Sequence, residues 1–409
     1  MDHGNHIATL PRPAYRNGHQ AQRALRFVLM MGAVSLFADM TYEGARSING
    51  QFLGLLGASG FWVSAIAGGG ELAGYGLRLF TGYWADRTRR YWALTICGYA
   101  VNLLLVPLLA LAGQWQVAGA LMIGERIGKG IRTPARDAML SYAGRALGTG
   151  WAFGLHEALD QTGATIGPLL MAAALYLHGD YHIAYAVLLL PAIGALLALA
   201  LARVTFPVPR ELERLPHMPV AHATRRFMLY LCGTSLVAAG FADFSLIAFH
   251  AHARHVMPDV WIPPLYALGM VSAGASALVF GRWFDRHGIG ALLAATALAA
   301  AFAPCVFFGN AMWVAIGVAL WGIGVGAHES VMRAAVARLF SPERRASAFG
   351  VFNTVFGVAW FLGSLALGWA YEHSLWSIVA LSVALQVFAL PLLFAAREGA
   401  NGDRKELRS

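Results

Sequence analysis

Stretches of about twenty mainly apolar residues follow one another along almost the whole chain, and they limit what it can fold into. A membrane-spanning helix needs about 20 such residues. A soluble domain usually carries about 25% charged residues, whereas this chain carries 12%. The sequence therefore predicts an all-α membrane protein with twelve transmembrane helices. Their approximate ranges are 25–48, 61–83, 92–112, 116–138, 149–176, 183–203, 227–251, 262–283, 290–308, 312–336, 347–371 and 375–396.

Arginines are distributed unevenly between the loops on the two sides of these helices. Loops that would share one side contain most of them, whereas the opposite loops contain only Arg254. Lysine and arginine accumulate in the cytoplasmic loops of membrane proteins. We therefore expect both termini to be cytoplasmic and the chain to be a multi-pass protein of a bacterial inner membrane. The arginines behind this orientation are Arg12, Arg16, Arg23, Arg87, Arg89, Arg90, Arg145, Arg210, Arg214, Arg225, Arg226, Arg344 and Arg345.

One polar, proline-rich segment, 204–226, divides the chain near its middle. Short sequences recur across it in the same order: FAD at 37–39 and 241–243, GYWADR at 82–87 and GRWFDR at 281–286, IGKG at 127–130 and IGVG at 323–326, and AFG at 152–154 and 348–350. Four ordered matches, at offsets between 196 and 204 residues, indicate a duplication. We predict two pseudo-symmetric six-helix bundles, 25–203 and 227–396, a cytoplasmic loop over 204–226, and cytoplasmic tails over 1–24 and 397–409.

The loop after the second predicted helix resembles a signature of the major facilitator superfamily, G-x-x-x-D-[RK]-x-G-[RK]-[RK]. The matching residues are Gly82, Asp86, Arg87 and Arg90, and in the later copy Gly281, Asp285 and Arg286. Arg89 stands where the second glycine of the signature belongs. Together with the duplicated six-helix half, the resemblance implies the superfamily fold. It also implies a gating role for these residues, with Asp86 and Asp137 expected to contact Arg89 or Arg90.

Two further signatures of the superfamily have counterparts here. R-x-x-x-G in the fourth helix matches Arg126 and Gly130, and the resemblance links this arginine to proton coupling. G-x-x-x-G-P in the fifth helix matches Gly163, Gly167 and Pro168. In the superfamily this pattern is associated with exporters that exchange substrate for protons, although small residues and proline also occur in ordinary helix packing.

Charged residues are concentrated in the first predicted bundle. A charge at mid-bilayer costs about 2.5–3.5 kcal/mol on insertion scales, so such residues must face a cavity or the bundle interior and pair with one another. Glu125, Lys129, Arg132 and Arg136 follow i, i+4, i+7, i+11 and therefore lie on one helix face. Partners can come from other helices, either as structural ion pairs or as groups that carry protons or bind substrate.

We assign candidate roles to these residues. Candidates for proton coupling are Asp39, Glu43, Arg126 and Asp160. Candidates for the substrate cavity are Glu71, Glu125, Lys129, Arg132, His156, Glu157, Asp243, His328 and Glu329. Asp39 and Glu43 lie one helical turn apart, so both could exchange protons from a central cavity. A structural pairing of either carboxylate with Arg46 or Arg126 is the alternative.

Several other chemistries fit the sequence poorly. Gly124 and Gly128 are one residue too close for a phosphate-binding G-x-x-x-x-G-K-[ST] loop. In HESVM, Met332 replaces the second histidine of a zinc-protease motif, and no G-x-S-x-G occurs, so we predict no enzyme. Histidines of FHAHARH lack a nearby cysteine or acid to complete a metal site. The net charge of +9 has no soluble basic domain through which to bind nucleic acid. No cofactor is expected.

The leading hypothesis is a secondary transporter that works by rocker-switch alternating access and exports a small organic molecule in exchange for protons. Proton-coupled uptake of a small, possibly anionic, solute is the alternative within transport. A sensor that kept the fold but lost transport would be expected to lose its cavity charges, which this chain retains. Without a nucleotide loop, the energy should come from an ion gradient. We expect a monomer, because two bundles already enclose a pathway.

Overall fold

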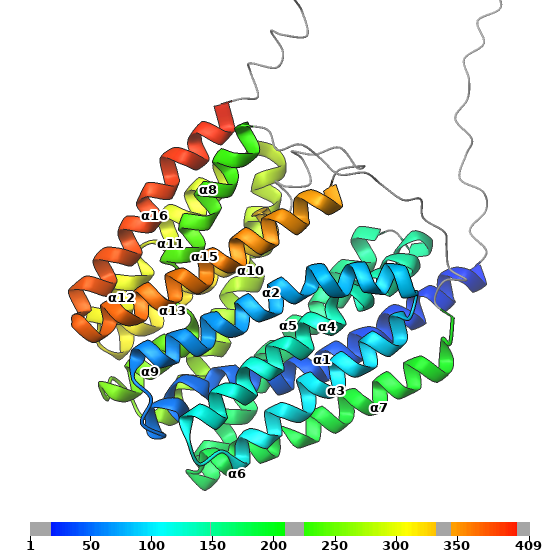
Figure 1. Cartoon of the computed structure of the whole chain (residues 1–409), viewed down its shortest axis with the longest axis horizontal. Coiled ribbons are helices and arrows are strands. Elements are labelled where there is room, and N and C mark those ends of the chain that lie inside the picture. The colour runs from blue at the N-terminus through cyan, green and yellow to red at the C-terminus, as the bar shows by residue number, and fades with distance from the viewer. Residues whose placement is uncertain (1–17, 148, 209–224, 333–344, 399–409) are drawn as a thin grey trace, which may run out of the picture.

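The computed structural model describes residues 18–147, 149–208, 225–332 and 345–398, and every element within these ranges is a helix (Figure 1). The first half contains α1 Gly18–Leu55, α2 Gly60–Thr88, α3 Tyr91–Leu108, the short η1 Leu109–Leu111, α4 Trp115–Leu147, α5 Thr149–His178, α6 Tyr181–Val187 and α7 Leu189–Thr205. The second contains α8 Arg225–Gly240, α9 Phe244–Ala253, η3 Asp259–Trp261, α10 Ile262–His287, α11 Gly290–Ala299, α12 Phe302–Phe308, α13 Ala311–Ala327, the π-helical η4 His328–Met332, α15 Arg345–His373 and α16 Leu375–Glu398.

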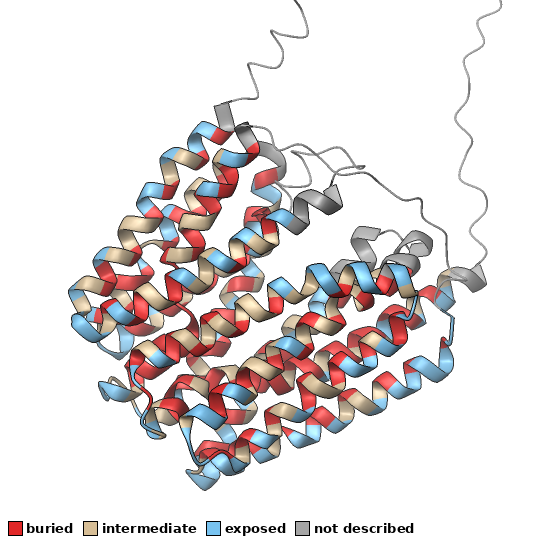
Figure 2. Cartoon of the chain, viewed as in Figure 1, coloured by how far each residue is buried: buried red, intermediate tan, exposed pale blue. Residues whose placement is uncertain are grey.

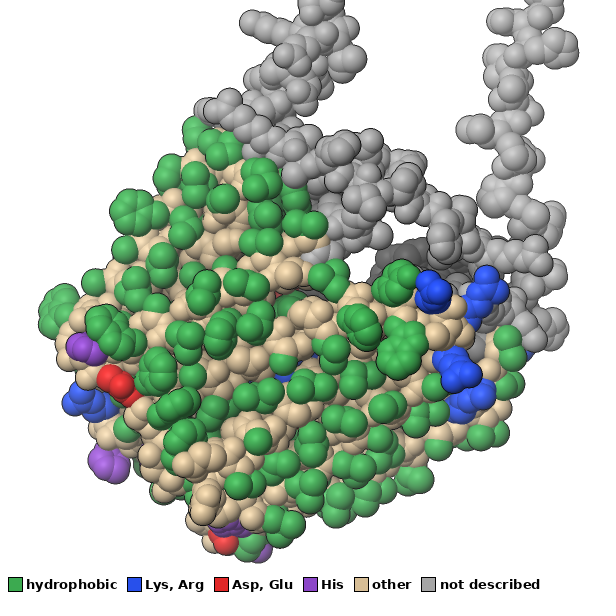
Figure 3. All heavy atoms as spheres, in the orientation of Figure 1, with side chains coloured by type: hydrophobic (Ala, Val, Ile, Leu, Met, Phe, Trp, Pro, Cys, Tyr) green, Lys and Arg blue, Asp and Glu red, His purple; other side chains and the backbone are tan. Residues whose placement is uncertain are grey.

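Eight stretches of helix within these described ranges are long and apolar enough to cross a membrane. They are Ala21–Leu55, Tyr91–Leu111, Tyr181–Thr205, Phe227–Ala253, Asp259–Phe284, Gly290–Phe308, Val351–His373 and Leu375–Ala396. Buried residues lie on the inward faces of the helices (Figure 2), and the outer side is covered with apolar side chains (Figure 3). Leu111 and Val204, for example, are 80% and 78% exposed. An apolar outer surface of this extent suits lipid rather than water.

Helices α1 and α5 pack closely because glycines face the neighbouring backbone. A methyl group on Gly163 would lie 3.0 Å from Asp39 Cβ, and one on Gly167 would lie 2.9 Å from the backbone nitrogen of Gly44. Small residues allow helix backbones to approach in this way. The packing brings Asp39 of α1 alongside α5, the helix that carries Asp160.

The two groups of helices meet mainly at one end of the molecule. We call the end where α1 begins and α16 ends the terminal end, and the opposite one the far end. Near the far end, a methyl group on Gly68 of α2 would lie 2.6 Å from Ser364 Cβ of α15, and one on Gly368 of α15 would lie 2.7 Å from Ser64 Cβ of α2. Toward the terminal end α2 and α15 separate (Figure 1). The contact between the groups is therefore concentrated at the far end.

The repeated FAD sequence has different structures in the two halves. Residues 37–39 lie inside the continuous helix α1, whereas residues 241–243 interrupt the helix between α8 and α9. Side chains satisfy the carbonyl groups that this interruption exposes: Ser382 Oγ donates to the Gly240 carbonyl at 2.6 Å, and Trp321 Nε1 donates to the Ala242 carbonyl at 2.9 Å. Asp243 caps the N-terminus of α9. Broken helices of this kind are tolerated in membranes only when the exposed backbone groups find partners.

The turn between α2 and α3 depends on a residue with an unusual backbone conformation. Arg89 ends α2 with φ 60° and ψ 17°, in the left-handed region. Glycine, which the superfamily signature has at this position, adopts this conformation without strain. For a residue other than glycine the conformation costs roughly 1–2 kcal/mol.

Candidate functional site

A network of buried ion pairs connects three helices of the first half. Arg126 of α4 lies between two carboxylates: its Nη1 is 3.5 Å from Glu71 Oε1, and its Nε is 3.2 Å from Glu125 Oε2. Arg46 Nη2 of α1 is 3.5 Å from the same Glu71 oxygen. Lys129 Nζ lies 3.8 Å from Glu43 Oε1. The predicted partners on α1, α2 and α4 are therefore brought together, each acid beside at least one base, as burial of charge requires.

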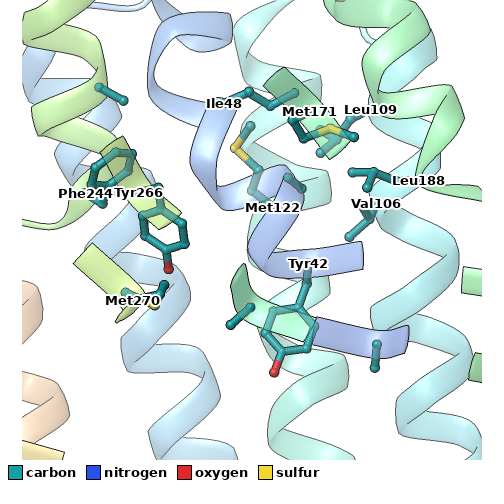
Figure 4. Packing of buried hydrophobic residues seen from close by; sticks show 14 of the residues in the cluster. Tyr42, Ile48, Val106, Leu109, Met122, Met171, Leu188, Phe244, Tyr266 and Met270 are labelled. Carbon is teal, nitrogen blue, oxygen red and sulfur yellow. The ribbon is translucent and has the colours of Figure 1, made fainter. Parts of the chain in front are cut away.

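Two contacts extend this network to the second half of the chain. Arg46 Nη2 lies 2.6 Å from Asp243 Oδ2, at the break between α8 and α9. The Tyr266 hydroxyl of α10 donates a short hydrogen bond to Glu43. Tyr266 of α10 packs beside Phe244 of α9, and Tyr42 lies across from them on α1 (Figure 4). A charged hydrogen bond of this kind must break if the two halves are to separate at this level.

A second polar group, formed by Ser35, Asp39, His156 and Asp160, lies between α1 and α5. Ser35 Oγ is 2.9 Å from His156 Nε2, and His156 Nδ1 is 3.6 Å from Asp160 Oδ2. Asp39 lies near enough to Asp160 for their charges to interact. Among the described residues, no lysine or arginine nitrogen lies within 4.0 Å of either aspartate, and Oδ1 of each has no hydrogen-bond partner. These carboxylates therefore differ from Glu43, Glu71 and Glu125, which all have cationic partners.

Arg132 is fully buried between two aromatic rings. Its Cζ lies 4.2 Å from the centre of the Tyr99 ring and 5.6 Å from that of Tyr42. Lys129 Nζ approaches the same Tyr42 ring at 4.1 Å. None of the guanidinium nitrogens of Arg132 has a hydrogen-bond partner among the described atoms. The faces of aromatic rings attract cations. Tyr99 and Tyr42 therefore stabilise the charge of Arg132 partly in place of an acidic partner.

A polar cavity of about 30 Å³ lies where the ion network crosses between the two halves. Arg46, Glu71, Glu125, Arg126 and Asp243 contribute to its lining. A volume of this size accommodates one or two water molecules rather than an organic substrate. The cavity can therefore hydrate the charges of the network at the far-end contact.

The gating residues of the sequence signature lie at the terminal ends of α2 and α10. An added methyl group on Gly82 would lie 3.6 Å from Pro134 Cβ of α4, and nothing lies within 4 Å of the corresponding position on Gly281. The side chains of Asp86, Asp285 and Arg286 lie outside the described part of the chain, and Arg87 and Arg90 are exposed. Asp137 pairs with its neighbour Arg136 at 2.8 Å. The expected contact of Asp137 with Arg89 or Arg90 is therefore wrong in this conformation, because Asp137 pairs with the guanidinium of Arg136 instead.

The remaining candidates are more dispersed. His328 is buried in the π-helical turn η4, with Nε2 3.5 Å from Thr296 Oγ1. Glu329 and Glu157 are exposed, and Glu157 accepts a hydrogen bond from Gln161. Pro168 is buried within α5 beyond the two packing glycines. The second half therefore contributes Asp243 to the ion network, while His328 lies apart from it.

Two residues of the site were missing from the sequence-based assignment of roles. The sequence predicts Arg46 only as a structural partner, whereas the structure shows it as the base that joins the two halves. Tyr266 has the sequence signal of an ordinary core aromatic residue, and only the three-dimensional packing places its hydroxyl on Glu43. His252, from the histidine cluster, contacts Asp259 at 2.9 Å, so the expectation that no acid lies near these histidines is wrong. Among the described residues no group of three or more His, Cys, Asp or Glu side chains is placed to hold a metal ion.

Comparison with known sequences identifies the family. The sequence model described as Major Facilitator Superfamily matches residues 25–364 and 261–407. The chain belongs to the major facilitator superfamily. This confirms the resemblance derived from the three signatures at the level of the superfamily, and its members are transporters rather than enzymes.

Relatives in two distant groups of organisms share most of the chain's length. An uncharacterized protein of Mycobacterium tuberculosis (strain ATCC 25618 / H37Rv) is 41% identical over 385 residues, which cover 92% of this chain and 94% of the relative. An uncharacterized MFS-type transporter of Methanocaldococcus jannaschii is 26% identical over 373 residues, which cover 88% and 92% of the two chains.

Solved structures of superfamily transporters share the fold. A mutant of the nucleoside transporter NupG aligns with a TM-score of 0.71 at 14% identity, covering 90% of this chain and 98% of NupG. A bacterial homolog of the human lysosomal transporter Spinster, inward-facing and unoccupied, aligns with a TM-score of 0.70 at 14% identity, covering 93% and 98%. At this identity the likeness establishes the fold alone. This major facilitator superfamily chain is thus a multi-pass membrane transporter of small molecules.

Proposed function

We propose that the chain is a proton-coupled exporter of a small organic molecule that works by alternating access. Its twelve spans would be the eight apolar stretches together with α2, α4, α5 and α13, whose charges or shorter length set them apart. Division at 204–226 gives two six-helix bundles. The arginine-rich terminal end would face the cytoplasm of a bacterium, and the transporter would act as a monomer in the inner membrane.

Proton coupling is supported most directly by Asp39 and Asp160. Asp39 is buried, the Asp160 side chain is 16% exposed, and the two are near enough for their charges to interact. Neither has a lysine or arginine partner among the described residues. Two largely buried carboxylates whose charges interact, and neither of which is ion-paired to a lysine or arginine among the described residues, are costly to ionise together in a low-dielectric interior. We infer that this pair holds a proton in the present conformation, and releases it when rearrangement of the bundles brings water or a cation to it.

Glu43 and Arg126 would have a different role from that of the aspartate pair. Both belong to the network that reaches Asp243 and Tyr266 across the far-end contact. In the alternating-access account, this network holds the far end closed while the terminal end is open. Separation of the halves would transfer Arg46 from Asp243 to Glu71 and Glu43, which already lie 3.5 and 4.0 Å away.

Export, rather than uptake, is supported by the sequence pattern in α5. Gly163, Gly167 and Pro168 follow the pattern associated with exporters, and the two glycines support the close α1–α5 contact beside Asp39. Proton-coupled uptake is the second candidate. Lys129 favours it, since its side chain is 22% exposed and could bind an anionic solute.

The proposal is tested by measuring accumulation of a panel of dyes and antibiotics in efflux-deficient bacteria that express the chain. Variants Asp39→Asn and Asp160→Asn remove the proposed proton site, Asp39→Glu retains a carboxylate, and Thr162→Ala alters an exposed position on the same helix as Asp160. Membrane expression is checked for each.

We expect lower accumulation with the wild type, Thr162→Ala and, in part, Asp39→Glu, and baseline accumulation with the asparagine variants or after the proton gradient is collapsed. Efflux that persists in both asparagine variants would contradict the proton role of this pair. Uptake instead of efflux would reverse the proposed direction.

A further inference from the structure

Six exposed arginines are gathered at one corner of the terminal end of the first half. We call this group the arginine corner. Its members are Arg23 and Arg26 at the start of α1, Arg87, Arg89 and Arg90 at the turn from α2 to α3, and Arg203 near the end of α7. The surface view shows basic side chains collected at this edge of the molecule, beside a side wall that is otherwise apolar (Figure 3).

An aromatic cluster holds the three chain segments of this corner together. The Phe27 ring of α1 lies 5.2 Å from that of Phe206 and 6.5 Å from that of Trp92 at the start of α3. Trp92 Nε1 donates to the Phe206 carbonyl at 3.0 Å, and the Arg203 guanidinium lies 5.8 Å from the Trp92 ring. The arginines therefore project from a packed base rather than from independent loops.

The corner lies where the lipid-facing surface ends. One to two turns earlier on α2, Phe80 and Tyr83 are each 63% exposed and Trp84 is 50% exposed. Arg87 Nη1 contacts the Tyr83 hydroxyl at 3.1 Å. Aromatic side chains of this kind occupy the interface of a bilayer, and arginines beside them reach the level of the phosphate groups.

The positive charge of the corner is not neutralised by described acidic side chains. None of the six arginines forms an ion pair with one. The described acids toward this end have partners of their own, since Asp137 pairs with Arg136 and Glu157 accepts from Gln161. The side chain of Asp86, on the same turn of α2, lies outside the described part of the chain. A cluster of guanidinium groups that pair with no acid among the described residues, at phosphate level, attracts anionic headgroups.

The corresponding turn of the second half has glycine at the position that Arg89 occupies in the first half. The repeat aligns GYWADR with GRWFDR, which pairs Arg89 with Gly288 at the same offset of 199 residues. Both have a positive φ, 60° at Arg89 and 59° at Gly288, whereas their ψ angles differ, 17° at Arg89 and −138° at Gly288. Glycine, the residue of the second half, adopts a positive φ without strain. The first half has an arginine there, which is worse for the backbone and adds a charge to the corner.

We propose that the arginine corner binds the phosphodiester headgroup of an anionic phospholipid. The guanidinium groups from α1, the α2–α3 turn and α7 would contact the phosphate, while Phe80, Tyr83 and Trp84 would pack along the acyl chains. The corresponding turn of the second half lacks these charges, because it contains Gly288, Ile289 and Gly290 where the first half has Arg89, Arg90 and Tyr91. This inference requires only that the chain lies in a bilayer and is independent of what it transports.

Native mass spectrometry of the full chain, released from nanodiscs of phosphatidylglycerol and phosphatidylcholine, tests the proposal. Each basic residue near a membrane surface contributes about fivefold to anionic-lipid affinity. We expect wild-type protein to retain phosphatidylglycerol in preference to phosphatidylcholine. The triple variant Arg87→Gln/Arg89→Gln/Arg90→Gln should lose on the order of a hundredfold of that preference. Arg282→Gln, which removes an exposed arginine at the same end of the second half, should leave it unchanged.

Arg89→Gly separates lipid binding from folding. It supplies the residue that the turn prefers, so the melting temperature should stay the same or rise while retention of phosphatidylglycerol falls about fivefold. Retention equal to that of the wild type in both Arg89→Gly and the triple variant would overturn the proposal. So would displacement of the lipid by millimolar inorganic phosphate alone, since that would identify a site for free phosphate.

Discussion

Asp243→Asn should loosen the far-end contact without disturbing the local fold. Asparagine caps helices about as well as aspartate, so the bond from the Ser245 backbone nitrogen that begins α9 can be kept. The change removes the negative charge that Arg46 meets at 2.6 Å across the two halves. Arg46 then retains Glu71 and Glu43 at 3.5 and 4.0 Å, so its own charge stays compensated.

The effect of Asp243→Asn on opening of the far end can be estimated from the burial of Arg46 and Asp243. The side chains of Arg46 and Asp243 are 15% and 4% exposed, so solvent screens their contact weakly. A hydrogen bond to a charged group contributes about 1.5–3 kcal/mol. Because Arg46 has alternative partners, we expect no added penalty for a stranded charge. If the far end is open in about 1% of wild-type molecules, the variant should raise that fraction to roughly 10–60%.

Spin–spin distance measurements can detect such a redistribution. Spin labels on Gln114 in the first half and His373 in the second, both exposed near the far end, would report separation of the halves there. The native cysteines, Cys97, Cys232 and Cys305, would first be replaced. We expect a longer distance component in Asp243→Asn that is minor in the parent protein.

Asp180→Asn supplies the matched control. Asp180 also caps a helix, accepting from the His182 backbone nitrogen at 2.7 Å, but it is outside the ion network. It should leave the distances unchanged. If Asp243→Asn gives the same distribution as Asp180→Asn, the Arg46–Asp243 pair does not hold the far end closed, and the reasoning from its burial is refuted.

Three substitutions test the packing around the site by thermal melting in detergent. Gly163→Ala should destabilise the chain by about 1–3 kcal/mol, because the added methyl group meets the backbone of α1, whereas Gly274→Ala on α10, with nothing within 4 Å, should not. Trp321→Phe should lower stability by about 1–3 kcal/mol, since it leaves a backbone carbonyl unpaired at the break between α8 and α9; an unchanged melt would argue that the break needs no such support. Tyr99→Leu should cost about 2 kcal/mol by removing the ring that faces buried Arg132, and Tyr99→Phe should cost less.

Much of the ion network could be predicted from the sequence because burial restricts the choices. Apolar stretches interrupted by acids and bases at helical spacing imply inward-facing faces, so Glu71, Glu125, Arg126 and Lys129 were placed in the interior correctly. The superfamily could be assigned from three short signatures. The separation of Asp39 from Glu43 could not be predicted, because residues four apart share a helix face yet meet different neighbours. Glu43 faces Lys129 and Tyr266, whereas Asp39 faces α5.

Features that depend on the packing of distant segments could not be predicted from patterns in the sequence. The two copies of FAD have the same sequence, but only the second interrupts its helix. Trp321 and Ser382, which are distant in the sequence, satisfy the carbonyl groups that this interruption exposes. The left-handed backbone of Arg89 also has no signal in a single residue type.

The proposed proton site can be tested most directly without knowing the substrate. The distance distribution between the spin labels on Gln114 and His373 would be measured from about pH 5 to about pH 9, on the wild type and on Asp39→Asn/Asp160→Asn. Our account predicts that the wild-type distribution changes across this range and that the double variant gives one distribution at every pH. A pH response that survives in the double variant, or none in the wild type, would contradict proton coupling through this pair.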